Sequence, residues 1–149
     1  MAKASTKAKS KTAKAKDRIK AKAKKEDLPG TIRRSPAKAR RTYTETLASA
    51  HEQYGGDEER AHRTALAALK HSFEKVGDHW EPKKRKGPSD AQAARRGRSA
   101  RRGGRTAGGV DVYGHTRGEL YDRAKRLGVK GRSRMTKQEL GEAIARKQD

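Results

Sequence analysis

The sequence predicts an all-α protein built from two small helical modules that are joined by disordered basic segments. Apolar residues recur at spacings of three and four in two separate regions, and helix-capping signals stand at the ends of both regions. With 30% hydrophobic and 39% charged residues, the 149-residue chain lacks the apolar side chains for one core of ordinary size. The predicted divisions are a Lys/Ala-rich tail over 1–26, a helical domain over 27–82, an Arg/Gly-rich linker over 83–109 and a helical module over 110–149.

The first helix of the domain 27–82 is expected to begin at Ser35-Pro36 and to end at Gly55-Gly56. Serine is a good N-cap, and proline suits the first helical position because the amide it lacks would have no partner there. Apolar and aromatic residues then follow at spacings of four, four, three and four, which is one face of an amphipathic helix. These residues are Ala39, Tyr43, Leu47, Ala50 and Tyr54.

A second helix is expected to follow directly, with Asp57 as its N-cap and Gly77 as its C-terminal stop. Its small apolar residues would allow the two helices to approach closely. Trp80 lies just past the stop, where its ring can cover the open end of so small a core. The predicted apolar stripe consists of Ala61, Ala65, Ala68, Leu69, Phe73 and Val76.

The module 110–149 is predicted to be a helix, an extended turn and a second helix. Thr116 with Glu119, and Thr136 with Glu139, have the spacing of a capping box at a helix start. Gly128 stops the first of the two helices. The residues expected to face inward are Leu120, Tyr121, Ala124 and Leu127 from the first helix, and Leu140, Ala143 and Ile144 from the second.

Positive charge is sorted by segment along the chain. Residues 1–26 carry 11 basic and 2 acidic residues and residues 83–109 carry 10 and 1, so each segment has a net charge of +9. These two segments, which have few large apolar residues, therefore hold 18 of the 22 excess positive charges. Cationic arms beside compact modules indicate a polyanionic partner, most often nucleic acid. A solubilising role without a fixed partner is the alternative.

Candidate phosphate-binding residues lie around the turn between the two C-terminal helices. The amides of a helix N-terminus can bind phosphate, and cations nearby reinforce that binding. Such contacts position the backbone of a nucleic acid and read no bases. The alternative is a solvated charged face. The candidates are Arg126, Lys130, Arg132, Arg134 and Lys137.

The Arg/Gly string at 95–105 supplies a second candidate set. It resembles RGG-type segments, which bind single strands through charge and guanidinium stacking, although it lacks interleaved aromatic residues. The alternative is an extended charged linker. The residues expected to bind nucleic acid here are Arg95, Arg96, Arg98, Arg101, Arg102 and Arg105.

Several function classes are excluded or disfavoured by what the sequence contains. The absence of cysteine excludes a disulfide framework, a zinc finger and a thiol catalyst. No histidine and acid set has the spacing of a metal site, His62 is expected to be packed and hydrogen-bonded, and acids such as Glu74 are expected at the surface. We therefore expect a non-enzyme with no cofactor, no metal and no transmembrane segment, located in the cytoplasm or at the nucleoid.

Residues 27–82 resemble the ChaB family, which is labelled a cation transport regulator. The specific part is the alanine-rich string Ala61-His62-Arg63-Thr64-Ala65-Leu66-Ala67-Ala68-Leu69-Lys70. The resemblance implies a small helical domain with a regulatory association. The other matching residues are Leu28-Pro29, Pro36, Tyr43, Leu47, Ala50, Tyr54 and Trp80.

Residues 116–147 resemble the N-terminal helical region of the transcription termination factor Rho, and also the SAP-type DNA-binding motif. The match lies in Leu127-Gly128-Val129 and in the run from Arg134 to Leu140. This resemblance implies a nucleic-acid-associated module. Because the chain has no G-x-x-x-x-G-K-[ST] phosphate loop, ATP-driven translocation on RNA is not expected.

Two functions from different classes follow. The first is a non-enzymatic accessory protein that binds the phosphate backbone of DNA or RNA without sequence preference, with a link to transcription termination or to a nucleoid or stress role. The second is a regulatory factor of the ChaB type that docks on a protein partner through the neutral domain 27–82. Base specificity and oligomeric state are not predicted.

Overall fold

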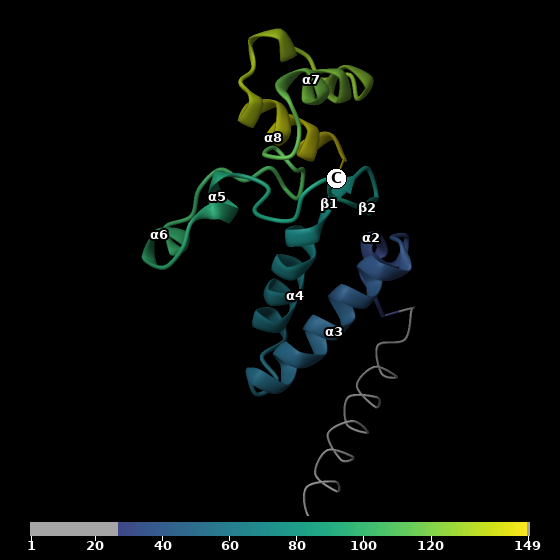
Figure 1. Cartoon of the computed structure of the whole chain (residues 1–149), viewed down its shortest axis with the longest axis vertical. Helices are drawn as coiled ribbons and strands as arrows, with labels where there is room; N and C mark the ends of the chain where they lie inside the picture. The colour runs from purple at the N-terminus through teal and green to yellow at the C-terminus, as the bar shows by residue number, and fades with distance from the viewer. Residues whose placement is uncertain (1–26, 149) are drawn as a thin grey trace, which may run out of the picture.

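The computed structural model describes residues 27–148, apart from the side chains of Ala100 and Arg101. The predicted tail 1–26 lies outside the described residues. The described chain is mostly helical, with one two-stranded sheet between the two groups of long helices (Figure 1). Within residues 27–148, none of the helices combines the length and the apolar character needed to cross a lipid bilayer.

The first group of helices comprises α2 (Gly30–Arg33), α3 (Ala37–Gln53) and α4 (Glu58–Ser72). Asp57 caps α4 as predicted, because its side chain accepts a hydrogen bond from the amide of Arg60 at 3.0 Å. The prediction for α3 was wrong in one respect: the N-cap is Pro36, which has no side-chain cap. Ser35 is instead buried, where its hydroxyl donates to the carbonyl of Thr31 and accepts from the amide of Trp80 at 2.8 Å.

The strictly all-α prediction is wrong, because α4 ends at Ser72 and a β-hairpin follows. Strands β1 (Phe73–Val76) and β2 (His79–Pro82) pair antiparallel, with Phe73 opposite Pro82 and Val76 opposite His79. Gly77 is therefore not a helix stop. It is the first of two turn residues, with φ +61°, a backbone conformation that glycine adopts without steric cost.

The hairpin places Trp80 over the end of the first core. Trp80 lies opposite Lys75 in the strand register and is 4% exposed. The prediction that this ring covers the core is confirmed, although a strand carries it rather than a loop. The core consists of Leu28, Ile32, Ala39, Tyr43, Ala65, Leu69, Phe73 and Trp80.

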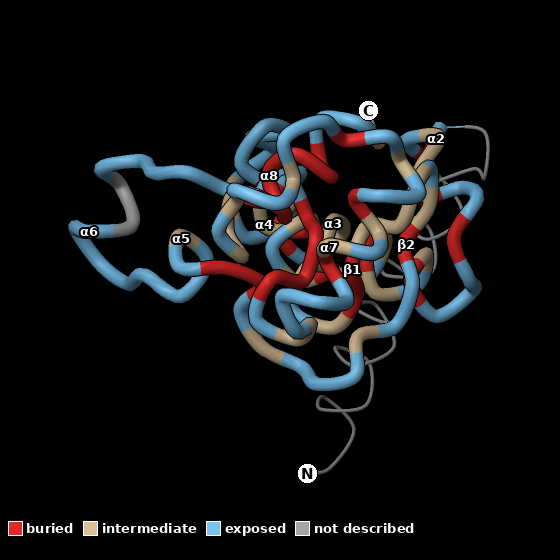
Figure 2. The backbone as a smooth tube through the Cα atoms, turned by 90° about the horizontal axis from the view of Figure 1, so that it is seen from above, coloured by how far each residue is buried: buried red, intermediate tan, exposed pale blue. Residues whose placement is uncertain are grey.

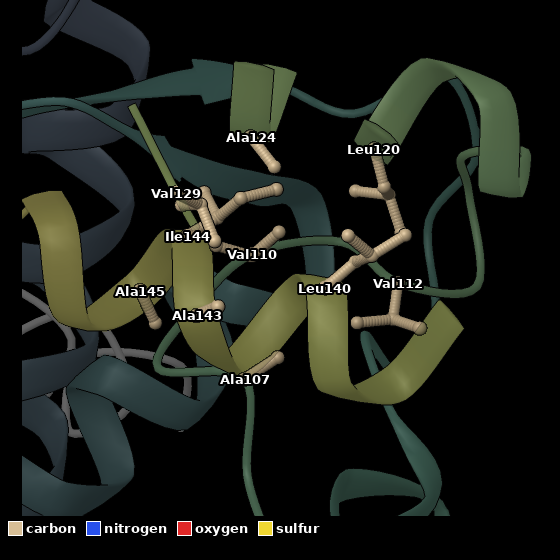
Figure 3. Close-up of a cluster of buried hydrophobic side chains, with 10 residues drawn as sticks. All are labelled: Ala107, Val110, Val112, Leu120, Ala124, Val129, Leu140, Ala143, Ile144 and Ala145. Atoms are coloured by element: carbon tan, nitrogen blue, oxygen red, sulfur yellow. The ribbon is translucent and has the colours of Figure 1, made fainter. Parts of the chain in front are cut away.

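The second group of helices comprises α7 (Arg117–Arg126), the short 3₁₀ helix η1 (Arg132–Arg134) and α8 (Lys137–Gln148). The capping box of α7 is present, and Gly128 follows the helix with φ +68° as predicted. Residues that precede α7 complete the core, and Gly141 of α8 allows Val112 to approach closely. Figure 3 shows this core, which consists of Ala107, Val110, Val112, Leu120, Ala124, Val129, Leu140, Ala143, Ile144 and Ala145.

Residues 83–109, which the sequence predicts as a disordered linker, carry two short helices, α5 (Ala91–Ala94) and α6 (Arg98–Arg101). Both ends of the segment are packed, because Ser89, Asp90 and Ala107 are buried. The middle leaves the body of the molecule as an exposed loop (Figure 2). The segment therefore differs from a freely extended linker at both of its ends.

Candidate nucleic-acid interface

The arginine-rich part of the chain forms a loop, residues 91–105, whose base is closed by one carboxylate. Asp90 Oδ1 accepts a hydrogen bond from the amide of Ala93 at 2.8 Å and so caps α5. Its Oδ2 accepts from the amide of Ala107 at 2.8 Å and from the hydroxyl of Thr106 at 3.1 Å. Asp90 is 2% exposed, so these three bonds are shielded from water. The two ends of the loop are thereby held side by side.

The segment that leads into this loop is fixed to the C-terminal end of α4. Lys83 Nζ donates to the carbonyls of Lys70 and Gly87 at 3.2 and 2.6 Å, and lies 3.5 Å from the carboxylate of Asp111. The amides of Lys83 and Gly87 donate to the carbonyls of Ser72 and His71. These bonds satisfy carbonyls that a helix C-terminus leaves without intrahelical partners, and the buried cation suits the helix dipole.

The arginines of the loop divide into two groups. Arg105 is anchored, because its guanidinium nitrogens lie 2.7 and 3.0 Å from the buried carboxylate of Glu142 on α8. Arg95 donates to the carbonyl of Gly103 across the loop at 3.1 Å. Arg96, Arg98 and Arg102 are exposed, while the side chain of Arg101 lies outside the description. The exposed arginines occupy the part of the loop farthest along the chain from its base.

The five candidates around the α7–α8 turn also divide. Arg126, Lys130 and Arg134 are exposed and Lys137 is half-buried. Arg132 is half-buried, with its guanidinium 5.4 Å from the ring centroid of Tyr121 and one nitrogen donating to the carbonyl of Val129 at 3.0 Å. Arg132 therefore packs the turn through a cation–π contact, and the exposed cations are those that a phosphate can reach.

The N-terminus of α8 is less open to an anion than the sequence suggested. The amide of Thr136 donates to Glu139 Oε2 at 2.7 Å, and the amide of Glu139 donates to the Thr136 hydroxyl at 3.3 Å. The Thr136 amide, followed by the Thr136 hydroxyl, holds the pKa of Glu139 below its ordinary value. A carboxylate thus already stands at this helix start, so phosphate contacts here depend on side chains rather than on the helix terminus.

Arg117 was missed as a positioning residue because its partners are carbonyls that sequence spacing does not reveal. From the first turn of α7, its guanidinium donates to the carbonyl of Met135 at 2.9 Å and to that of Ser133 at 3.3 Å. The two capping boxes mark the starts of α7 and α8, but no local pattern marks the hydrogen bonds by which Arg117 holds the turn between the helices. Arg117 holds the turn that carries Lys130 and Arg134.

Glu74 is the second residue whose role the sequence concealed. It was expected at the surface but is 8% exposed. Its carboxylate lies 3.1 Å from Arg123 of α7 and 2.7 Å from His115, and accepts from the amide of Asp111 at 3.3 Å. All three partners come from the second module, so a strand residue of the first domain organises the junction. The local signal for this strand was the turn pair Gly77-Asp78 that follows it, not the pattern of residues 73–76.

Histidines do not gather with acids into a metal site in the described chain. No group of three or more His, Cys, Asp or Glu side chains between residues 27 and 148 could hold a metal ion. His62 is hydrogen-bonded as predicted, with Nδ1 2.6 Å from the hydroxyl of Tyr43, but it is exposed rather than packed. Burial raises the pKa of the Tyr43 hydroxyl, which keeps it protonated and able to donate.

Comparisons with protein families identify two segments of the chain. Residues 28–83 match the ChaB family, and residues 116–149 match the family described as Rho termination factor, N-terminal domain. Both matches fall on the segments, and in the order, that the resemblances indicated. Comparison with curated proteins gives no match, and neither does comparison with solved structures.

Proposed function

We propose that this chain is a non-enzymatic accessory protein that binds the phosphate backbone of nucleic acids. The observation that carries the proposal is the loop 91–105, which contains six arginines and no acid and leaves the body of the molecule (Figure 2). Asp90 holds the two ends of the loop together, so the exposed guanidinium groups extend from a base whose position is fixed. Arginine forms strong charge-assisted hydrogen bonds to phosphate, which is why it is favoured where phosphates are recognised.

The second module supports this proposal with a separate set of cations. Arg126, Lys130 and Arg134 are exposed around the turn between α7 and α8 that Arg117 holds, and the module matches the N-terminal domain of Rho termination factor. Contacts of this kind fix a protein on the nucleic-acid backbone and supply affinity that does not depend on base sequence. The tail 1–26, with its net charge of +9, would add to that affinity. A cytoplasmic or nucleoid location, and a link to transcription termination or stress, belong to the same proposal.

The non-enzymatic part of the proposal is supported by how the titratable groups are used. The buried carboxylates of Glu74, Asp90 and Asp111 all bind amides or cations that hold the fold together. A general acid or base would need a reactive proton next to space for a substrate. These carboxylates are therefore assigned a structural role.

The test compares the full chain with two variants of equal charge change. The loop variant carries Arg96→Gln, Arg98→Gln and Arg102→Gln, and the control carries Arg33→Gln, Lys38→Gln and Arg41→Gln at exposed positions of α2 and α3. Fluorescence anisotropy with labelled duplex DNA and single-stranded oligonucleotides should show the loop variant binding at least tenfold more weakly than the control. Equal losses in the two variants would show that only net charge matters and would overturn the role of the loop.

Docking on a protein partner through residues 27–82 is the second candidate function. A groove of about 950 Å³ lies between the C-terminal half of α3 and the start of α4. It combines Tyr43 and Leu47 with the carboxylates of Asp27, Glu52 and Glu58, a lining suited to a basic peptide and unsuited to phosphate. Affinity capture from a nuclease-treated lysate separates the two functions: partners lost on treatment came through nucleic acid, and partners retained came through this domain.

A further inference from the structure

A second groove lies between α4 and the start of the arginine loop. Its volume is about 560 Å³, and its walls come from the ChaB segment on one side and from residues 87–96 on the other. The α4 wall is the face opposite the core stripe of Ala61, Ala65 and Leu69. The loop wall stays in place because Lys83 and Asp90 fix the segment 83–90, as described above. The groove is therefore built by the fold rather than by a mobile chain end.

The lining of this groove is cationic at its rim and apolar at its floor. Arg63 and Lys70 come from α4 and Arg96 comes from the loop, while Leu66, Ala67 and Ala93 provide apolar surface. No carboxylate lines it. Arg63 forms an exposed pair with Glu59 at 3.9 Å, which contributes little.

The absence of carboxylates distinguishes this groove from two other grooves among residues 27–148. The groove beside α3 is lined by Asp27, Glu52 and Glu58, and the depression beside α7 is lined by Glu119 and Asp122. A polyanion would be repelled by the acidic lining beside α3 and would meet mixed charge beside α7, where Lys84, Arg123 and Arg126 stand among the two carboxylates. In the groove beside α5 it would meet cations without carboxylates. Charge complementarity therefore favours a polyanion as the ligand of this groove.

We infer that the groove between α4 and α5 binds a single-stranded nucleic acid, with phosphates on Arg63, Lys70 and Arg96 and bases against the apolar floor. A duplex keeps its base faces stacked inside and cannot lay them on this floor, whereas a single strand presents both phosphates and bases. Guanidinium planes such as those of Arg63 and Arg96 can stack on bases where aromatic residues are absent. Arg96 belongs to both the groove and the loop, so one strand can pass from one to the other. This inference rests on the proposed function and assigns the ChaB segment a part in it.

The test uses anisotropy with labelled oligo(dT), oligo(rU) and a duplex of the same length. Ala67→Glu places a carboxylate on the groove floor at an exposed helical position, and Ala37→Glu makes the same charge change at an exposed position of α3. Ala67→Glu should weaken single-strand binding at least tenfold relative to Ala37→Glu, while duplex binding differs less than twofold between them. Arg63→Gln, which leaves the core untouched, should reproduce a smaller single-strand loss if Ala67→Glu impairs folding.

Cross-linking locates the strand directly. Oligo(dT) containing 4-thiothymidine, irradiated on the full chain and digested with trypsin, should label the α4 peptide Thr64–Lys70. Equal effects of the two glutamate variants on single strands, or label confined to other peptides, would overturn the inference while leaving loop binding intact. Failure of the unaltered chain to bind either polymer would overturn both the inference and the proposed function. A preference for oligo(dT) or oligo(rU) would assign the groove to DNA or RNA.

Discussion

The carboxylate of Glu74 and the guanidinium of Arg123 form an ion pair at 3.1 Å that joins the hairpin to α7 across 49 residues of sequence. The two side chains are 10% and 13% exposed. Arg123 also donates to the carbonyl of Lys75 at 2.6 Å and to the side chain of Gln148 at 2.7 Å. The two modules are therefore connected by shielded polar bonds as well as by the chain between them.

Replacing Glu74 with glutamine should destabilise the folded chain by about 3–5 kcal/mol, because it leaves a buried guanidinium without its charge partner. Urea unfolding followed by Trp80 fluorescence measures the free energy of unfolding. Glu81→Gln is the matched control, since Glu81 is exposed on the paired strand and opposite Glu74. The free energy of unfolding of this control variant should fall by less than about 1 kcal/mol. Similar losses in the two variants would contradict the assigned junction.

Gly109 allows the junction to close around Trp80. Its φ is +96°, and a Cβ there would lie 2.7 Å from Cη2 of the Trp80 ring. Gly109→Ala should cost about 2–4 kcal/mol from backbone strain and overpacking together. Gly128→Ala shares the strain, with φ +68°, but meets no atom within 4 Å, so about 1 kcal/mol is expected. Thermal unfolding of the two variants measures both losses of stability. A larger loss for Gly128→Ala than for Gly109→Ala would contradict this prediction.

Asp90→Ala should release the base of the arginine loop. The change removes the cap of α5 and the acceptor for the Ala107 amide, so hydrogen exchange at Ala93 and Ala107 should accelerate. Limited trypsin digestion should also cleave within 95–105 sooner than in the unaltered chain. Asp122→Ala, at an exposed position of α7, serves as the control and should change neither readout. Unchanged exchange at Ala107 in the Asp90 variant would refute the closed base.

Glu119 should make stability depend on pH in the acid range. The amide of Thr116, then Lys84 and His115, lower the pKa of Glu119 from 4.5 to about 2. Because the pKa of Glu119 is lower in the folded chain than in the unfolded chain, its ionised carboxylate stabilises the fold at any pH above the unfolded-state pKa. This stabilisation is lost as the pH falls through the folded-state pKa. The Tm difference between the chain and Glu119→Gln should therefore be constant above about pH 5 and should shrink toward pH 2. A difference independent of pH across this window would rule out the ionised carboxylate as its source.

Local signals in the sequence predicted the four long helices and several of their caps, whereas the cap at Ser35 and the helix stop at Gly77 were wrong. Asp57, Thr116 and Gly128 act through bonds or backbone angles within one helical turn, so spacing alone identifies them. The hairpin was missed because Phe73 and Val76 continue the helical stripe of α4. The pair Gly77-Asp78 is the competing signal, since glycine followed by aspartate between β-prone residues is typical of a two-residue hairpin turn.

The candidate site was harder to predict because its geometry depends on long-range partners. Charge counting found the arginine string but could not show that Asp90 closes it or that Glu142 holds Arg105. It also could not separate Arg132, which packs on Tyr121, from the exposed Lys130 two residues earlier. Pairs of charges far apart in sequence carry no local pattern, so only the folded arrangement distinguishes anchoring cations from accessible ones.

The salt dependence of nucleic-acid binding tests the central claim most directly. Each phosphate neutralised on duplex DNA contributes about −0.9 to the slope of log K against log salt concentration. The slope for the variant with Arg96→Gln, Arg98→Gln and Arg102→Gln should therefore be shallower than that of the unaltered chain by up to about 3. The slope for the control variant at Arg33, Lys38 and Arg41 should be shallower by less than about 1. A slope near zero for the unaltered chain, or one that the loop variant leaves unchanged, would contradict phosphate binding by the loop.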